Sequence, residues 1–291
     1  MAVINELESD LPRPDDTHVP GGPKVRVYKP TTSAPQSLPL VLFIHGGGWF
    51  AGNLETEDRT CRMLCGLADS LVVSVEYRCG FDVPLETEVQ DCVKAFSWAR
   101  EQAAELRADP KKLVVLGGSA GGALAVSAVY QLIKAGKGDQ IAGLVCMNGL
   151  SVLPEATPPG YKHLMKSYEE NDGPLPFVSG KDTFGVYEHR KITADNINTD
   201  IFPTAGGPQA MRGFPATYIV TSDNDASRDD GTVLEAVLKD AGVRVKRDNF
   251  VGLAHYFWTF PLPKANERFW ESLIGGIRWT LEASDSHVAS P

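Results

Sequence analysis

No stretch of this sequence is apolar for long enough to cross a membrane. A membrane-spanning helix needs roughly 18 or more consecutive apolar residues, and no run in the 291 residues approaches that length. The amino-terminal stretch MAVINELESD carries acidic residues and lacks the apolar core of a signal peptide. We therefore expect a cytoplasmic protein that does not insert into membranes.

Positive charge is also scarce, because 28 Lys and Arg residues stand against 37 Asp and Glu residues and give a net charge of −9. This balance argues against nucleic acid or an anionic membrane surface as a partner. The acidic residues are dispersed rather than gathered in a tail. We expect a small-molecule substrate.

Cysteines are few and follow no pattern. Their number, five, is odd, they are not spaced as metal ligands, and the sequence contains no Asn-x-Ser/Thr glycosylation site. Free thiols in a reducing compartment are therefore expected. Nothing in the sequence indicates a metal, a flavin, a nucleotide or any other cofactor.

Short β-rich runs alternate with helical patterns along most of the chain, without internal repeats. This alternation predicts one α/β domain with a mostly parallel central sheet and helices on both faces. Strands are expected at 24–28, 39–44, 71–75, 112–116, 142–147, 216–221 and 243–249. Apolar stripes at helical spacing predict helices over 92–106, 233–241 and 269–281, and residues 283–291 are expected to form a polar tail.

Residues 151–214 interrupt this alternation. Seven prolines separate short, weakly periodic pieces of the stretch. We predict an inserted cap or lid that lies over the carboxyl ends of the strands, where open α/β sheets bind their ligands.

The stretch VLGGSAGGALAV, residues 115–126, places four glycines around Ser119 between a predicted strand and a predicted helix. A sharp strand-to-helix turn crowds the backbone of its central residue, and Gly117 and Gly121 provide the missing side chains that such a turn requires. The pattern predicts a nucleophile elbow, with the amide of Ala120 directed at a developing oxyanion. A glycine-rich turn that only packs a helix on the sheet is the alternative. A phosphate loop is disfavoured because no Lys-Ser or Lys-Thr follows the glycines.

A serine nucleophile needs a histidine that takes its proton and an acid that orients the histidine. The acidic loop at 223–231 follows the strand predicted at 216–221 and can supply the carboxylate. Of the six histidines, only His255 lies in a post-strand loop beyond that acid. The resulting chain order, Ser, Asp and His, is the order of an α/β-hydrolase.

The strand predicted at 39–44 leads directly into HGGGW, residues 45–49. Consecutive glycines leave backbone N–H groups unshielded, so Gly47 and Gly48 can join Ala120 in an oxyanion hole. A tight turn without a ligand is the alternative, and it is disfavoured by the elbow motif in the same chain.

Five segments together resemble the hormone-sensitive-lipase-like group of carboxylesterases: HGGGW, SVEYR, GGSAGG, DNDASRDDG and GLAHYF. The resemblance spans roughly residues 17–280. It implies an α/β-hydrolase fold in which Ser119 is the nucleophile, Asp225 the acid and His255 the base. Asp223, two residues from Asp225, is the less favoured acid.

The same resemblance implies three oxyanion donors, Gly47, Gly48 and Ala120, and a structural role for His45. The sequence departs from the group at Gly118, where Asp is usual, and at residues 79–84, where Leu-Ala-Pro-Glu is typical. HGGGW also begins early, so the amino-terminal cap is reduced to residues 1–16. The oligomeric state stays open, although a reduced cap leaves surface that a second copy could cover in a homodimer.

Several aromatic residues flank the predicted catalytic loops, and we expect about half of them to line an apolar substrate pocket: Trp49, Phe50, Tyr256, Phe257 and Trp258. The sequence thus predicts a serine carboxylesterase for a small to medium ester. Hydrolysis of an amide or arylformamide by the same triad stays open, as does a lyase, dehydratase or cyclase reaction. A binding module on an inactive hydrolase fold is disfavoured because all three catalytic residue types are present.

Overall fold

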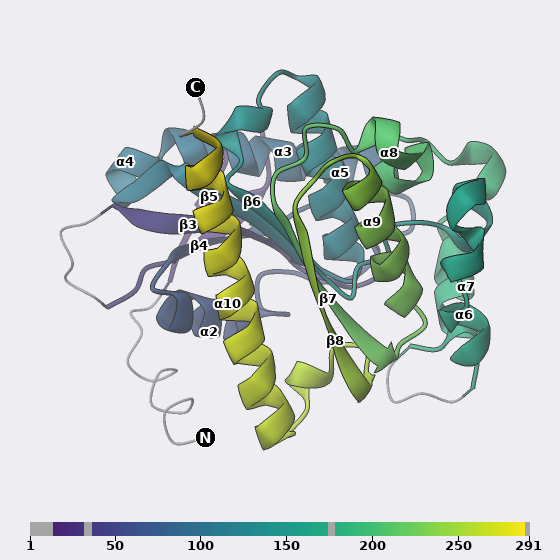
Figure 1. Cartoon of the computed structure of the whole chain (residues 1–291). Coiled ribbons are helices and arrows are strands. Elements are labelled where there is room, and N and C mark those ends of the chain that lie inside the picture. Colours follow the sequence, from purple (N-terminus) through teal and green to yellow (C-terminus); the bar gives the residue numbers. More distant parts are fainter. Residues whose placement is uncertain (1–13, 32–36, 174–177, 289–291) are drawn as a thin grey trace.

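The computed structural model describes residues 14–31, 37–173 and 178–288, and a single sheet runs through this part of the chain (Figure 1). Its strands are β1 (Asp15–His18), β2 (Lys24–Tyr28), β3 (Leu38–Ile44), β4 (Leu71–Glu76), β5 (Ala108–Gly118), β6 (Gly143–Met147), β7 (Thr217–Asn224) and β8 (Val245–Ala254). They lie in the order β1-β2-β4-β3-β5-β6-β7-β8. β2 pairs antiparallel with β1 and with β4, and the other neighbours are parallel.

The inner strands are apolar on both faces because helices cover both sides of the sheet. In β3, Leu40, Leu42 and Ile44 contribute to one hydrophobic core, whereas Val41 and Phe43 contribute to the other. This division follows the two-residue period of a strand. All five side chains are fully buried, which explains why the strand appears in the sequence as an unbroken apolar run.

Helices cover the two faces of the sheet unequally (Figure 1). One face carries α2 (Asp58–Ala68) and α10 (Pro263–Val288), and the opposite face carries α3 (Leu85–Glu101), α5 (Ala120–Lys134) and α9 (Arg228–Asp240). Two 3-10 turns, η1 (Gly138–Gln140) and η6 (Phe257–Thr259), lie in connections. No helix in the described ranges is both long and apolar enough to cross a membrane.

The segment between β6 and β7 contains only short helices in its described residues. These are η2 (Pro154–Ala156), η3 (Pro159–Leu164), α6 (Ser167–Glu170), α7 (Gly180–His189), η4 (Ala194–Asn196), η5 (Pro203–Gly206) and α8 (Gly207–Ala210). Tyr187 of α7 packs on Trp49, with 5.9 Å between ring centroids. Arg190, directly after α7, forms a buried ion pair with Glu88 of α3. The insertion predicted at 151–214 therefore packs against the loop that follows β3.

All seven predicted strands are present, and β2 has the predicted bounds. The sequence analysis missed β1, because its residues, DDTH, are all exposed and carry no apolar alternation. Of the reduced cap predicted at 1–16, residues 1–13 lie outside the described residues, and Asp15 and Asp16 belong to β1 at the sheet edge.

Two helix predictions also need correction. The helix predicted over 92–106 is divided at Gln102, so that α3 ends at Glu101 and the short α4 (Ala103–Leu106) follows. The polar tail predicted from residue 283 instead continues α10 as far as Val288. Ala283 is buried, and this burial extends the packed face of α10 beyond the predicted apolar stripe.

Two adjacent glycines of α10 provide a matched test of its packing. A Cβ at Gly276 would lie 2.2 Å from the ring of the buried Tyr218, whereas a Cβ at Gly275 would meet nothing within 4 Å. We expect Gly276→Ala to lower the free energy of unfolding by about 1–3 kcal/mol through overpacking. Gly275→Ala should raise it by about 0.5–1 kcal/mol, because alanine loses less backbone entropy in a helix. Denaturant unfolding measures both, and equal effects would contradict this packing.

Candidate active site

Ser119 lies at a strained turn between β5 and α5. Its backbone has φ 53° and ψ −124°, a conformation that L-residues rarely adopt. A Cβ at Gly117 would lie 2.1 Å from the carbonyl oxygen of Gly121, and one at Gly121 would lie 2.2 Å from the carbonyl oxygen of Ile44. The predicted need for bare backbone around the serine is therefore confirmed.

The structure brings the side chains of Ser119, His255 and Asp225 together. The Ser119 hydroxyl donates to His255 Nε2 at 3.0 Å, and His255 Nδ1 donates to Asp225 Oδ2 at 2.8 Å. All three side chains are buried or nearly so, and Ser119 keeps 9% of its surface exposed. This is the hydrogen-bonded chain that a nucleophilic serine requires.

Two residues that the sequence analysis missed hold the carboxylate of Asp225. Asn148, directly after β6, donates its side-chain amide to Asp225 Oδ2. Ser227 donates its backbone N–H to Asp225 Oδ1 at 2.8 Å and its hydroxyl at 2.9 Å. Burial raises the pKa of Asp225, but the attraction of His255 and these hydrogen bonds outweigh it and hold the pKa below its usual value. The carboxylate therefore stays ionised beside the imidazole.

Asn148 and Ser227 each left a signal in the sequence. Asn148 follows a buried strand and so stands at the carboxyl edge of the sheet, and Ser227 lies two residues after Asp225, the spacing of an Asx turn. Asp223, the less favoured acid, contacts another group: its Oδ2 accepts the backbone N–H of Gly252 at 3.3 Å. The geometry thus brings Asp225, and not Asp223, to the histidine.

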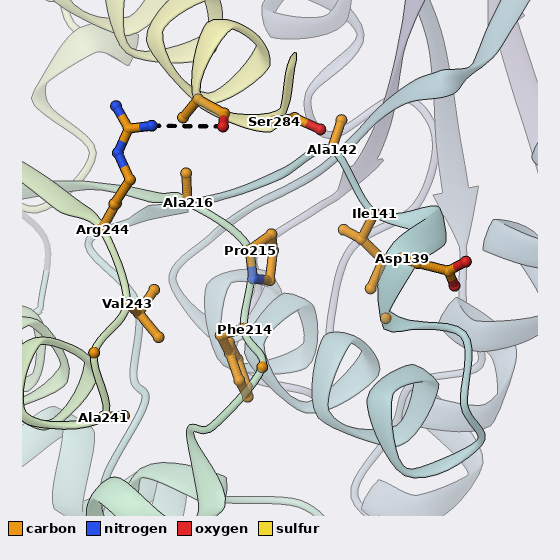
Figure 2. Close-up of a pocket in the computed structure, with 14 residues that line it drawn as sticks. Asp139, Ile141, Ala142, Phe214, Pro215, Ala216, Ala241, Val243, Arg244 and Ser284 are labelled. Atoms are coloured by element: carbon orange, nitrogen blue, oxygen red, sulfur yellow. Dashed lines mark hydrogen bonds between the residues drawn. The ribbon is translucent and has the colours of Figure 1, made fainter. Parts of the chain in front are cut away.

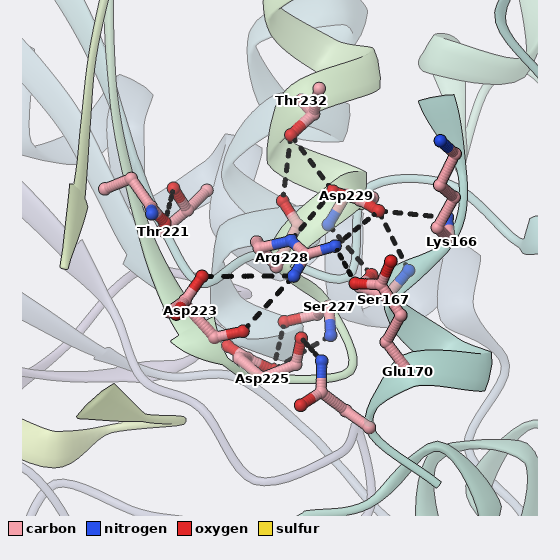
Figure 3. Close-up of polar contacts among 12 residues, drawn as sticks. Lys166, Ser167, Glu170, Thr221, Asp223, Asp225, Ser227, Arg228, Asp229 and Thr232 are labelled. Atoms are coloured by element: carbon pink, nitrogen blue, oxygen red, sulfur yellow. Dashed lines mark hydrogen bonds and ion pairs between the residues drawn. The ribbon is translucent and has the colours of Figure 1, made fainter. Parts of the chain in front are cut away.

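The loop after β7 also attaches to the insertion (Figure 3). Arg228 donates to the carbonyl oxygen of Asp223 at 3.4 Å and to the carboxylate of Glu170 at 2.6 Å. Asp229 Oδ2 accepts the backbone N–H of Ser167 at 2.8 Å. Because Glu170 and Ser167 belong to α6, the loop that carries Asp225 and the inserted segment are fixed to each other.

The glycine loop after β3 presents free backbone donors. Gly47 has φ 120° and Gly48 has φ 62°, both in the region that favours glycine. The carbonyl oxygen of Gly47 accepts the N–H of Ala51 at 3.0 Å and closes a tight turn. The N–H groups of Gly47 and Gly48 donate to no acceptor in the described residues. Ala120 is the first residue of α5, where a helix leaves its N–H without an internal partner.

His45 begins this loop and is fully buried. Its Nδ1 donates to the carbonyl oxygen of Gly46 at 2.7 Å, and its ring stacks on Tyr77 with 4.3 Å between centroids. Burial lowers the pKa of His45 and keeps the imidazole neutral. Its contacts are those of a residue that holds the loop.

Glu57, which the sequence analysis did not single out, lies buried beneath the same loop. Its Oε1 accepts the N–H of Gly46 at 2.9 Å and the hydroxyl of Tyr256 at 3.1 Å. Burial raises the pKa of Glu57 to about 7. No signal marked it, since it stands in the polar stretch NLETED.

The aromatic residues predicted for a substrate pocket lie in different places. Trp49 and Phe257 are each 1% exposed and belong to the two hydrophobic cores, so the structure places them in the interior rather than on an open pocket wall. Tyr256 is buried beneath the Ser119 elbow, and Trp258 stacks on Phe269. Phe50 alone of the five is exposed, at 37%.

The cavity drawn in Figure 2 has neither Ser119, Asp225 nor His255 in its lining. Its lining includes Ala142, Ala216 and Arg244, which directly precede β6, β7 and β8, whereas the serine, acid and histidine follow the carboxyl ends of strands. It therefore belongs to the opposite edge of the sheet. Within the described part of the chain, no three His, Cys, Asp or Glu side chains are grouped to hold a metal ion.

The pKa of Glu57 predicts a pH-dependent effect on stability. A carboxyl whose pKa rises from 4.5 to about 7 on folding binds its proton more tightly in the native state, so stability falls as pH rises between those values. Replacing it by a neutral isostere removes this loss. Relative to wild type, Glu57→Gln should gain about 3 kcal/mol in free energy of unfolding between pH 4.5 and pH 8.

Denaturant unfolding at the two pH values measures this difference. Glu105→Gln, in an exposed position on α4, is the matched control and should follow wild type. A constant difference between Glu57→Gln and wild type across the range would contradict the buried, titrating carboxyl.

Comparison with known proteins identifies the family of this chain. A family described as alpha/beta hydrolase fold matches residues 41–259. The versiconal hemiacetal acetate esterase of Dothistroma septosporum is 35% identical over 89% of this chain and 78% of its own length.

Two solved structures are also similar. An esterase of Pyrobaculum calidifontis superposes with a TM-score of 0.81 at 25% identity, covering 95% of this chain and 88% of that one. A vibralactone cyclase superposes with a TM-score of 0.83 at 28% identity, covering 97% and 86%. The chain therefore belongs to the alpha/beta-hydrolase fold family, within its hormone-sensitive-lipase-like carboxylesterase group, and is an enzyme of the esterase type.

Proposed function

We propose that this enzyme is a serine carboxylesterase that hydrolyses a small to medium carboxylic ester through an acyl-enzyme. The observation that carries the proposal is the hydrogen-bonded chain from Ser119 through His255 to Asp225, at 3.0 and 2.8 Å. It stands at the turn between β5 and α5, close to the glycine loop after β3: a Cβ at Gly46 would lie 3.2 Å from the carbonyl oxygen of Gly118.

In the first half of the reaction, Ser119 Oγ attacks the ester carbonyl carbon while His255 Nε2 takes the hydroxyl proton. The carbonyl oxygen becomes an oxyanion that accepts hydrogen bonds from Gly47, Gly48 and Ala120. His255 then gives its proton to the alcohol oxygen, which leaves, and the acyl group stays on the serine. In the second half, His255 takes a proton from water while the water oxygen attacks the acyl carbon, and His255 then gives this proton to Ser119 Oγ as the carboxylic acid leaves.

The ionised Asp225 supports this cycle by holding His255 in the tautomer whose Nε2 can accept the serine proton. Its carboxylate also stabilises the imidazolium that forms after each proton transfer. The hydrogen bonds from Asn148 and Ser227 keep the carboxylate in place.

The comparisons support an ester as the substrate. The relative from D. septosporum is named for an acetate ester, which favours a short acyl group here. Packing of Tyr187 on Trp49 places the insertion close to the oxyanion loop and favours an acyl group of limited size. We further propose a reducing compartment, the cytoplasm, because four of the five free thiols are buried and none is paired in the described chain.

A second candidate is a cyclase reaction, which the likeness to the vibralactone cyclase structure favours. In that case an internal hydroxyl of the substrate, and not water, would complete the reaction. Turnover of a p-nitrophenyl ester followed by intact-mass spectrometry distinguishes the two. Hydrolysis releases the free acid and leaves the acyl adduct on Ser119 only transiently, whereas an enzyme in which water does not complete the reaction would keep the acyl group on the serine.

Substitution of the nucleophile tests the proposal directly. Ser119→Ala should lower kcat/KM for p-nitrophenyl acetate by at least about 10⁴-fold, because it removes the hydroxyl that His255 Nε2 contacts. Circular dichroism and thermal unfolding should show that the variant stays folded. Turnover by a folded Ser119→Ala variant close to that of wild type would contradict the proposal.

The two neighbouring aspartates provide a matched control for that experiment. Asp225→Asn should lower kcat/KM on the order of 10⁴-fold, because the amide favours the wrong histidine tautomer. Asp223→Asn changes the same group two residues away and should stay within about tenfold of wild type, since Asp223 bonds to Gly252 and not to His255. Equal losses of kcat/KM in the two variants would contradict the assignment of Asp225 as the acid.

A substrate series tests the class of bond and the size of the acyl group. We expect kcat/KM to be higher for p-nitrophenyl acetate and butyrate than for the palmitate, because the insertion limits the space beside the serine. An arylformamide assayed alongside should be the poorer substrate. A clear preference for the formamide would replace the carboxylesterase proposal with an amidase of the same triad.

A further inference from the structure

Tyr256, directly after the histidine, adopts a backbone conformation that favours glycine. Its φ is 55° and its ψ 30°, in the left-handed region. It is nevertheless a bulky aromatic residue, and it is only 8% exposed. The contacts of its side chain must therefore hold this conformation in place.

The Tyr256 phenol fills a space that exists only because two glycines line it. A Cβ at Gly118 would lie 2.1 Å from the Tyr256 hydroxyl oxygen and 2.9 Å from its ring carbon Cζ. A Cβ at Gly46 would lie 2.6 Å from the same oxygen. Gly118 directly precedes Ser119, and Gly46 directly precedes the proposed oxyanion donors. The hydroxyl thus lies between the elbow and the oxyanion loop, where the sequence departs from Asp at position 118.

Glu57 links the Tyr256 hydroxyl to the backbone of the oxyanion loop. The Tyr256 hydroxyl donates to Glu57 Oε1 at 3.1 Å, and the N–H of Gly46 donates to the same oxygen at 2.9 Å. Tyr256 and Glu57 are 199 positions apart in the chain, and both are buried. Burial also raises the pKa of Tyr256 well above its usual value, so that the phenol remains a hydrogen-bond donor. One carboxylate oxygen therefore joins the histidine loop to the oxyanion loop.

We propose that Tyr256 and Glu57 are positioning residues that set the oxyanion loop relative to the Ser119 elbow and His255. Neither side chain reaches the reacting atoms, because the phenol lies between Gly46 and Gly118 and acts through their backbones. The inference rests on the proposed function. Its consequence is that the pair affects the chemical step, through the alignment of the oxyanion donors, more than it affects substrate binding.

Removal of the hydroxyl tests the proposal with little change in packing. Tyr256→Phe should lower kcat for p-nitrophenyl acetate about tenfold, with KM within about twofold of wild type, because misaligned donors weaken transition-state stabilisation. Glu57→Leu should cause a similar loss. Glu57→Gln should retain more kcat than Glu57→Leu, since its amide oxygen can still accept from both donors. Tyr218→Phe is the matched control: this buried tyrosine also donates to a carboxylate, Asp248 at 2.7 Å, but away from the site.

A double substitution tests the steric contact between position 118 and the Tyr256 phenol. Gly118→Ala alone should lower kcat about tenfold or more, because its methyl group collides with the phenol. In a Tyr256→Gly background, the same Gly118→Ala change should cost less than about threefold, since the space is then empty. The proposal is overturned if Gly118→Ala is equally harmful in both backgrounds, if Tyr256→Phe alters only KM, or if Tyr218→Phe loses as much kcat as Tyr256→Phe.

Failure of the positioning role of Tyr256 can be distinguished from failure of the carboxylesterase proposal. If wild type and Ser119→Ala both fail to hydrolyse every ester tried, the carboxylesterase proposal fails by itself. The four proteins of the Gly118 and Tyr256 cycle then still test the contact through their thermal unfolding. Gly118→Ala should lower the unfolding temperature in the presence of Tyr256 and not in its absence, and equal shifts would overturn the steric contact.

Discussion

The arrangement of the site depends on one steric constraint, the close approach of three backbone segments around Ser119. The end of β5, the start of α5 and the end of β3 come so near one another that a Cβ at Gly117 or Gly121 would overlap a carbonyl oxygen. Because these strands are parallel, the loops after β3, β6, β7 and β8 open at the same edge of the sheet. The serine is raised into that edge, where the His255 imidazole contacts its hydroxyl, and where Asp225, which accepts from the Asn148 amide, contacts the imidazole.

Residues with local signals could be predicted from the sequence. Inner strands such as β3 show as unbroken apolar runs because both of their faces are buried. Ser119 and His255 followed from the motif around the serine and from the position of the histidine after a strand, and the structure places them in hydrogen-bonding distance. Asp225 could be chosen over Asp223 only through the family resemblance, since both stand in one acidic loop.

Features that arise from distant contacts could not be predicted. Glu57 stands in an ordinary polar stretch, and its role depends on a tyrosine 199 positions away. Tyr256 appeared as an aromatic residue suited to a pocket, because nothing local indicates that its ring turns beneath the elbow. The strand β1 could not be predicted for another reason. An exposed edge strand needs no apolar face, so its polar sequence resembles a loop. Proline interruptions marked the insertion, but its contacts with Glu88 and Trp49 left no trace in the sequence.

The position of Trp49 has an optical consequence. Its indole is buried directly after Gly48 and contacts two rings of the inserted segment, Tyr187 at 5.9 Å and Phe202 at 6.1 Å between centroids. Displacement of that segment would expose the indole to water and shift its fluorescence emission to longer wavelength. The chain thus contains an intrinsic fluorophore that would respond to displacement of the inserted segment, without an attached dye.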